Sequence, residues 1–138
     1  MNAWAALETP LDEPLDAAIH IDAKDKHPDD ELRRVVQFRT ECRLLLPHVL
    51  LIAVPNAGKR GFAAQRQVKR EGLIAGTPDL IALARGKVAF LEFKAGTTMP
   101  DQRQSDMLNR LYRMGYPVGV FRRAESAIGW LRKKGFGV

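Results

Sequence analysis

The stretch GTPDLIALARGKVAFLEFK, which runs from Gly76 to Lys94, decides the fold. It contains two apolar segments, residues 79–84 and 87–94, separated by Arg85-Gly86. A two-residue connection that contains glycine is typical of a β-hairpin, and the Gly-Thr-Pro at the start of the stretch interrupts any preceding helix or strand. The sequence therefore predicts two antiparallel strands joined by a tight turn.

The predicted register of this hairpin brings charged side chains together at one end. If Ala84 pairs with Lys87, then Asp79 lies directly opposite Glu92, with Cβ atoms about 5 Å apart on one face. Lys94 lies two residues beyond Glu92 and points to the same face. Two adjacent carboxylates repel each other, and a hard divalent cation such as Mg²⁺ relieves the repulsion by binding oxygens from both. The pattern indicates metal-assisted phosphodiester hydrolysis, in which Lys94 orients or deprotonates a water or stabilises transition-state charge.

A structural alternative remains open at this point. Asp79, Glu92 and Lys94 could form an ion triad at the edge of the sheet, in which the lysine only neutralises the two acids. A short Asp…Glu-x-Lys string is common by itself. The hairpin register, the preceding Gly-x-Pro turn and the basic background favour the site over the triad.

Helical and strand patterns alternate around the hairpin. The predicted order is a helix from Asp30 to Pro47, a strand over 49–54, a helix over 61–71, strands over 79–84 and 87–94, a helix between Pro100 and Gly115, a strand over 116–121 and a helix over 124–134. This order predicts an α/β domain with helices flanking a central mixed sheet of four strands.

Two of these elements carry specific packing predictions. The first helix begins after a cap at Asp29 or Asp30, and one face of it is expected to be buried. The residues of that face are Leu32, Val35, Val36, Cys42 and Leu45. The strand over 49–54 is a continuous apolar run, which is typical of a strand covered on both faces.

Charge is divided unevenly along the 138 residues. Residues 1–31 hold nine acidic residues against two lysines, whereas residues 32–138 hold the other 20 basic residues against seven acidic ones. A domain this basic is typical of proteins that bind nucleic acid, although solubility alone is an alternative. Residues 1–28 are predicted to be a mobile acidic tail with a short helix near Leu15–Ile21, ahead of a domain over 29–138.

Composition excludes several classes of protein. No apolar run approaches the ~18 residues that a transmembrane helix needs. The single cysteine, Cys42, excludes intrachain disulfides and zinc sites with two or more thiolates, and the three histidines are scattered. No Lys or Arg precedes Lys24, so the positive start of a secretory signal is missing. We therefore expect a cytoplasmic protein without a membrane partner.

Several short motifs occur in a particular order along the chain. They are Pro55-Asn56-Ala57-Gly58-Lys59-Arg60, a basic helix, Gly76-Thr77-Pro78-Asp79-Leu80, Leu91-Glu92-Phe93-Lys94, a helix that carries Gln102, and Gly115-Tyr116. In this order they resemble the virus-type replication-repair nuclease (VRR-NUC) domain of the PD-(D/E)xK nuclease superfamily. The resemblance extends from about Glu31 to Trp130.

The resemblance implies a restriction-endonuclease-like core and a DNA endonuclease that depends on Mg²⁺ or Mn²⁺. It implies cleavage of branched or junction DNA in replication, repair or recombination. Asp79 and Glu92 would ligate the metal, Lys94 would be the catalytic lysine, Gln102 would lie beside the site, and Glu31 would complete the acidic cluster. A homodimer is expected, because one small domain offers limited surface to a branched substrate.

The predicted DNA contacts come from four basic residues near the second helix, Lys59, Arg60, Arg66 and Lys69. They are candidates for phosphate binding, and a solvated helix face is the alternative. Two other functions remain open. The chain could be a catalytically silent nucleic-acid-binding module, or a regulatory subunit whose acidic leader competes with DNA for the basic surface. Cleavage that needs Mg²⁺ and stops with EDTA would distinguish an enzyme from both.

Overall fold

The hairpin predicted around Arg85-Gly86 is confirmed. Strands β3 (Leu80–Ala84) and β4 (Lys87–Phe93) pair antiparallel in the predicted register. Gly86 in the turn has a φ of 70°, a conformation that glycine adopts without steric cost. Continuing the register by one step beyond the last strand pair brings Asp79 opposite Glu92.

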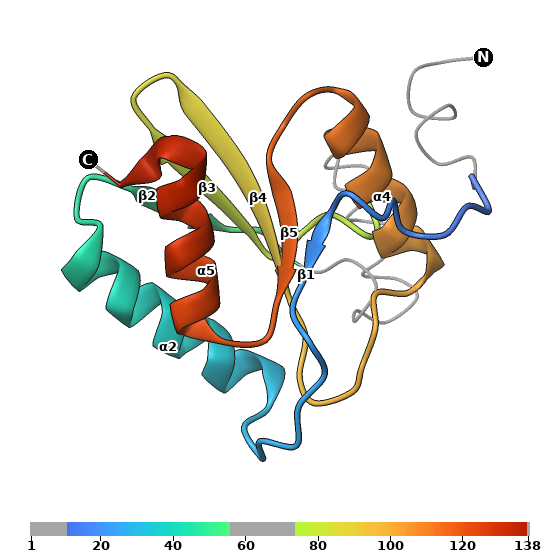
Figure 1. The fold of residues 1–138 in the computed structure, drawn as a ribbon, viewed down its shortest axis with the longest axis horizontal. Helices are drawn as coiled ribbons and strands as arrows, with labels where there is room; N and C mark the ends of the chain where they lie inside the picture. The colour runs from blue at the N-terminus through green and yellow to red at the C-terminus, as the bar shows by residue number, and fades with distance from the viewer. Residues whose placement is uncertain (1–10, 56–73, 138) are drawn as a thin grey trace.

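A mixed sheet of five strands lies at the centre of the fold (Figure 1). The computed structural model describes residues 11–55 and 74–137, and this sheet is built from strands within those ranges. The spatial order of the strands is β1-β5-β4-β3-β2, with β1, β5 and β4 parallel and the β4–β3 and β3–β2 pairs antiparallel. The strands outside the hairpin are β1 (His20–Ile21), β2 (Leu50–Ala53) and β5 (Val118–Phe121). The predicted α/β class with a mixed sheet is confirmed, and the predicted number of strands is wrong.

The additional strand, β1, comes from the segment for which the sequence predicts a mobile tail. Residues 11–28 instead pack against the domain, and no helix forms near Leu15–Ile21. Ile19 is buried against the sheet, and the buried Asp22 accepts hydrogen bonds from the backbone N–H groups of Arg122 and Arg123. A two-residue strand is too short to show an alternating pattern, and a buried aspartate gives no apolar signal, which is why the prediction for this segment is wrong.

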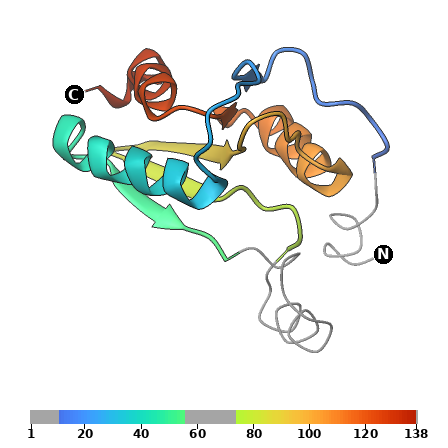
Figure 2. The ribbon, with the colours of Figure 1, turned by 90° about the horizontal axis from the view of Figure 1, so that it is seen from below.

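Helices lie on both faces of the sheet. On one face, α2 (Glu31–Leu45) and α5 (Ala124–Leu131) pack side by side and cover the apolar side chains of β3, β4 and β5 (Figures 1 and 2). On the opposite face, α4 (Gln102–Arg113) packs on β5 through Leu108. Alternation along β4 separates the two faces, with Leu91 and Phe93 toward α2 and α5 and Phe90 toward the other face.

The buried face of α2 differs from the predicted one. Its fully buried positions are Arg34, Phe38 and Cys42. Leu32 is 70% exposed, Val36 is 55% exposed and Leu45 is 52% exposed. An arginine thus occupies the inner face where a leucine or valine is expected, because its guanidinium finds partners there. The predicted N-cap is confirmed, since the carboxylate of Asp30 accepts a hydrogen bond from the backbone N–H of Arg33.

The prediction that strand β2 is covered on both faces is wrong. It is an edge strand that pairs with β3, and its side chains Leu50 and Ile52 are 60% and 42% exposed. The apolar composition of the segment therefore reflects strand propensity more than burial.

The elements of the carboxyl-terminal half agree closely with those predicted from the sequence. Helix α4 lies between Pro100 and Gly115 as predicted, and α5 continues into a short π-type turn, η2 (Arg132–Phe136). The helix predicted over 61–71 lies outside the described residues. Among the helices of residues 11–55 and 74–137, none has the length and apolar character needed to cross a membrane.

Candidate functional site

Three carboxylates from three different elements converge at one end of the sheet. Glu31 is the first residue of α2, Asp79 directly precedes β3, and Glu92 lies near the end of β4. One oxygen from each lies within 4.8 Å of the others. The structure therefore brings together all three acids that were predicted as metal ligands.

Backbone N–H groups of both neighbouring strands hold Asp79, one through its carboxylate and the other through its backbone carbonyl. Its Oδ2 accepts a hydrogen bond of 2.9 Å from the backbone N–H of Phe93, and its own carbonyl accepts one of 2.8 Å from the backbone N–H of Val54. The aspartate thereby continues the pairing of β3 with both neighbouring strands for one residue beyond the strand end.

Gly76 connects this aspartate to the start of α4. The residue has a φ of 85°, and a Cβ atom there would lie 2.5 Å from the carbonyl oxygen of Arg103. Only glycine permits so close an approach of the two backbones. The Gly-x-Pro-Asp motif therefore forms a turn and also a close backbone contact with α4. The glycine is the only sign of this contact in the sequence.

Glu92 is fully buried and lacks part of its hydrogen bonding. Its Oε1 accepts a bond of 3.4 Å from the side-chain amide of Gln104, whereas its Oε2 has no donor among the described residues. Burial raises the pKa of the Glu92 carboxyl, and the adjacent Asp79 carboxylate raises it further. In the absence of a cation the site therefore favours a protonated Glu92, which can share its proton with Asp79.

Lys94 follows two residues later and is also buried, at 7% exposed. Its backbone N–H donates to the carbonyl of Phe121, which holds the end of β4 against β5. Its positive charge lowers the pKa of Glu92 and so acts against the effects of burial and of Asp79. The structure therefore buries both residues of the Glu-x-Lys spacing at the same end of β4, as the register predicts.

The glutamine that contacts the site is Gln104, and the prediction that Gln102 lies beside it is wrong. Gln102 is exposed, and its side-chain amide donates to the carbonyl of Glu13 and to Asp106. Asp101 caps α4 in a reciprocal pair with Gln104, which sets the rotation of the helix. Residues two positions apart on a helix point about 200° apart, so only one of the two glutamines can face Glu92.

The donor set suits a hard divalent cation. All three convergent ligands are carboxylate oxygens, which are the ligands that Mg²⁺ and Mn²⁺ prefer over nitrogen or sulfur. The Oε2 of Glu92, which lacks a donor among the described residues, is a buried acceptor whose desolvation a cation would compensate. Glu31, Asp79 and Glu92 can therefore hold a metal ion.

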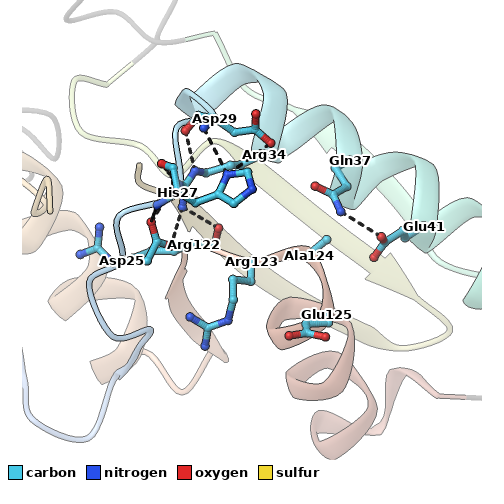
Figure 3. A pocket seen from close by; sticks show the side chains of 10 residues that line it. All are labelled: Asp25, His27, Asp29, Arg34, Gln37, Glu41, Arg122, Arg123, Ala124 and Glu125. Carbon is cyan, nitrogen blue, oxygen red and sulfur yellow. Dashed lines mark hydrogen bonds and ion pairs between the residues drawn. The ribbon is translucent and has the colours of Figure 1, made fainter. Parts of the chain in front are cut away.

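A hollow of about 400 Å³ lies between the start of α2 and the start of α5 (Figure 3). Arg34 is buried there and donates to both carboxylate oxygens of Asp25 and to the carbonyls of His27, Asp29 and Arg122. These bonds occupy the guanidinium completely, so Arg34 supports the fold and is not available to a ligand. It anchors α2 one turn after Glu31.

Arg122 has a similar supporting role that the sequence did not reveal. It is 1% exposed, and its guanidinium donates to the carbonyls of Asp22 and Gly96. Burial lowers the pKa of this guanidinium. Arg122 thus connects β1, the segment after β4 and the end of β5.

The four residues predicted to bind phosphate, Lys59, Arg60, Arg66 and Lys69, lie outside the described residues. The comparisons with known proteins add no relative to this geometry: no protein-family model, no curated protein and no solved structure matches the chain.

Proposed function

We propose that this protein is a divalent-metal-dependent nuclease that hydrolyses phosphodiester bonds in DNA. One observation carries the proposal: oxygens of Glu31, Asp79 and Glu92 lie within 4.8 Å of one another, and the buried Lys94 directly follows the strand that carries Glu92. A purely structural ion triad would leave the lysine as the partner of both acids. Here a third acid joins the cluster and Glu92 Oε2 lacks a donor among the described residues, which favours a cation site over a triad.

Mg²⁺ or Mn²⁺ is the proposed metal, held by these three carboxylates. When bound, such an ion supplies Lewis-acid polarisation of a phosphoryl oxygen and a more acidic water. Lys94 has a separate role, because it is buried directly after the strand that carries Glu92, and its charge acts on the Glu92 carboxyl. It can orient the attacking water and stabilise negative charge on the phosphoryl oxygens in the transition state.

The preference for DNA rests on charge and on the order of elements. The basic residues outnumber the acidic ones by 20 to seven over residues 32–138, which attracts a polyanion. The order of elements is the one expected for a restriction-endonuclease-like core of the VRR-NUC type. It runs from a helix and a strand to a hairpin with paired acids, and then to a helix, a parallel strand and a final helix. Branched DNA as the preferred substrate and a homodimeric form belong to the same proposal.

Cleavage of a panel of substrates tests the proposal. The purified full chain is incubated with linear duplex, flap and four-way-junction DNA, and with RNA, in Mg²⁺, in Mn²⁺ and in EDTA. We expect metal-dependent cleavage of at least one DNA substrate. Asp79→Asn and Lys94→Met should lower the rate about 100-fold or more, while DNA binding measured in EDTA persists.

Lys87→Met is the matched control for Lys94→Met, because Lys87 is an exposed lysine at the other end of β4. Its rate of cleavage should stay close to that of the wild type. Binding of DNA without cleavage in either metal would contradict the proposal and favour a silent binding module. Equal loss of binding and cleavage in Asp79→Asn would mean that the acid is structural.

A further inference from the structure

A second concave site lies at the amino end of β5, between the carboxyl-terminal ends of α4 and α5. Its cavity measures about 260 Å³. His20, Tyr112 and Trp130 supply aromatic rings to the lining, and Lys133 and Lys134 supply ammonium groups. No carboxylate of residues 11–55 or 74–137 lines it. The combination of rings and cations without acids is the chemistry that binds single-stranded nucleic acid.

This cavity is separate from the carboxylate cluster. Gln104, which contacts Glu92, and Tyr112, which lines the cavity, are eight residues apart on α4, or roughly 12 Å along the helix. Within the sheet, Val118 at the cavity pairs with Phe90, whereas Glu92 pairs further along β5. A ligand could therefore occupy the cavity without contact to the proposed metal ligands.

The aromatic wall is held in place by core packing. The His20 ring stacks on Phe121 with a centroid distance of 5.1 Å and an interplanar angle of 22°. Phe121 in turn contacts the edge of Trp130 at 5.1 Å. A hydrogen bond of 2.7 Å between His20 Nε2 and Asp22 fixes the rotation of the imidazole. The His20 and Trp130 rings therefore need little ordering when a ligand binds, which favours affinity.

The two lysines come from the turn η2, which is itself anchored. Phe136 is buried, and its carbonyl lies 2.7 Å from Nε2 of His48. Lys134 places its ammonium 5.9 Å from the Trp130 ring centroid. Neither Lys133 nor Lys134 has a carboxylate partner among the ion pairs of the described residues. The dipole of α5 favours lysines at this end, but it does not account for the aromatic cavity beside them.

We propose that this cavity binds one nucleotide unit of a single-stranded nucleic acid, outside the metal centre. The base packs against the exposed faces of His20 and Tyr112, and the phosphate binds Lys133 and Lys134. The volume, about 260 Å³, lies just below the range of about 300–1,000 Å³ that is typical of ligand cavities, so the cavity has room for no more than one nucleotide unit. The choice of nucleic acid as the ligand rests on the proposed function.

Tryptophan fluorescence provides a test that needs no catalysis. The chain contains two tryptophans, so Trp4→Phe leaves Trp130 as the single reporter. This variant of the full chain is titrated in EDTA with an eight-residue thymidine oligonucleotide, with thymidine monophosphate and with inorganic phosphate. We expect saturable quenching by the oligonucleotide and at least tenfold weaker binding of the other two. Binding of the monophosphate as tight as that of the oligonucleotide would overturn the assignment to a strand.

Substitutions of the lysines and of an aromatic ring test whether the fluorescence change arises from binding in this cavity. Lys133→Gln with Lys134→Gln should weaken binding and lower the slope of log affinity against log salt by about 0.7 for each lysine removed. Tyr112→Leu should weaken binding roughly tenfold. The matched control is Lys24→Gln with Lys26→Gln, which removes the same charge from exposed positions outside the cavity. Equal effects of the two double variants would overturn the proposal.

The outcome is independent of the nuclease assay. Asp79→Asn should leave the fluorescence titration unchanged. Metal-dependent cleavage by a chain that shows no quenching refutes this cavity and leaves the nuclease proposal standing. Quenching by a chain that never cleaves refutes the nuclease proposal and supports the cavity as a binding site.

Discussion

The guanidinium of Arg34 donates to both carboxylate oxygens of Asp25, from Nη1 to Oδ2 at 2.8 Å and from Nη2 to Oδ1 at 3.0 Å. Arg34 is 4% exposed and lies one turn into α2, whereas Asp25 belongs to the segment between β1 and that helix. The pair therefore holds this segment against α2 one helical turn after Glu31. The position of one proposed metal ligand depends on an ion pair that does not touch the metal site.

Asp25→Asn should lower stability in a manner that depends on pH. The hydrogen bonds from Arg34 lower the pKa of the Asp25 carboxyl to about 2, against about 3.9 in the unfolded chain. The unfolded state thus binds the proton first, so the stabilisation is complete above pH ~4 and is lost as the pH falls toward 2. We expect the difference in melting temperature between wild type and variant to be constant from about pH 7 to 5 and to shrink between about pH 4 and 2.

Glu125→Gln is the control for this pH series, because Glu125 is an exposed acid that lines the same hollow. Its difference from the wild type should be small at every pH. A constant deficit of Asp25→Asn down to about pH 2 would show that the asparagine acts through packing alone.

The sequence was sufficient to predict the hairpin that carries Asp79 and Glu92, because that part of the candidate site is local. A two-residue turn and the alternation of side chains along a strand are enough to bring Asp79 opposite Glu92 and to point Lys94 to the same face. No long-range information was needed. Glu31 was predicted as a metal ligand only from the resemblance to a nuclease family. Its distance from Asp79 and Glu92 depends on how α2 packs on the sheet, which the hairpin alone does not determine.

The buried charges could not be predicted by the same reasoning. Arg34 occupies an inner face of α2 because Asp25 and the carbonyl of Arg122, 88 residues later, are there to accept its hydrogen bonds. The periodicity of apolar residues cannot identify a helix position at which a charged side chain is buried. The prediction of Gln102 in place of Gln104 is wrong for a related reason, since the facing residue depends on the rotation that the cap at Asp101 gives to α4.

Gly76→Ala should destabilise the fold more than Gly86→Ala. Both glycines have a positive φ, at 85° and 70°, so alanine at either position costs about 1–2 kcal/mol of backbone strain. At Gly76 the added Cβ would also overlap the carbonyl of Arg103, while at Gly86 no atom of the described residues lies within 4 Å. The overlap should add about 1–3 kcal/mol. The free energy of unfolding in urea measures both, and equal losses would contradict the close contact between the Gly-x-Pro-Asp turn and α4.

Gln104→Leu should weaken metal binding, while Gln102→Leu should not. Gln104 donates to Glu92 Oε1 and so orients one proposed ligand, whereas Gln102 bonds to Glu13 and Asp106. Loss of such a supporting hydrogen bond typically costs about 10- to 100-fold in metal affinity. Calorimetric titration with Mn²⁺ measures the change. The loss of the cap partner in Gln104→Leu costs about 0.5–2 kcal/mol of stability. Similar Mn²⁺ affinities for the two variants would exclude Gln104 as a positioning residue.

Glu92→Gln should stabilise the protein in EDTA and abolish its response to metal. Burial and the neighbouring Asp79 raise the pKa of Glu92, so the folded state keeps a proton that the unfolded state releases above pH ~4.3. Wild-type stability therefore falls as the pH rises above that value, and a glutamine avoids the loss. Its amide can donate to Asp79 while its oxygen still accepts from Gln104.

The expected gain is absent near pH 4 and grows as the pH rises toward 8, by at most about 1.4 kcal/mol for each pH unit. Thermal unfolding of wild type and variant across this pH range measures it. Saturating Mn²⁺ should raise the melting temperature of the wild type and have little effect on Glu92→Gln, because ligand binding stabilises only the folded state that holds it. A variant less stable than the wild type at about pH 8 in EDTA would show that Glu92 is part of a satisfied ion triad with Lys94, which is the arrangement that excludes a cation site.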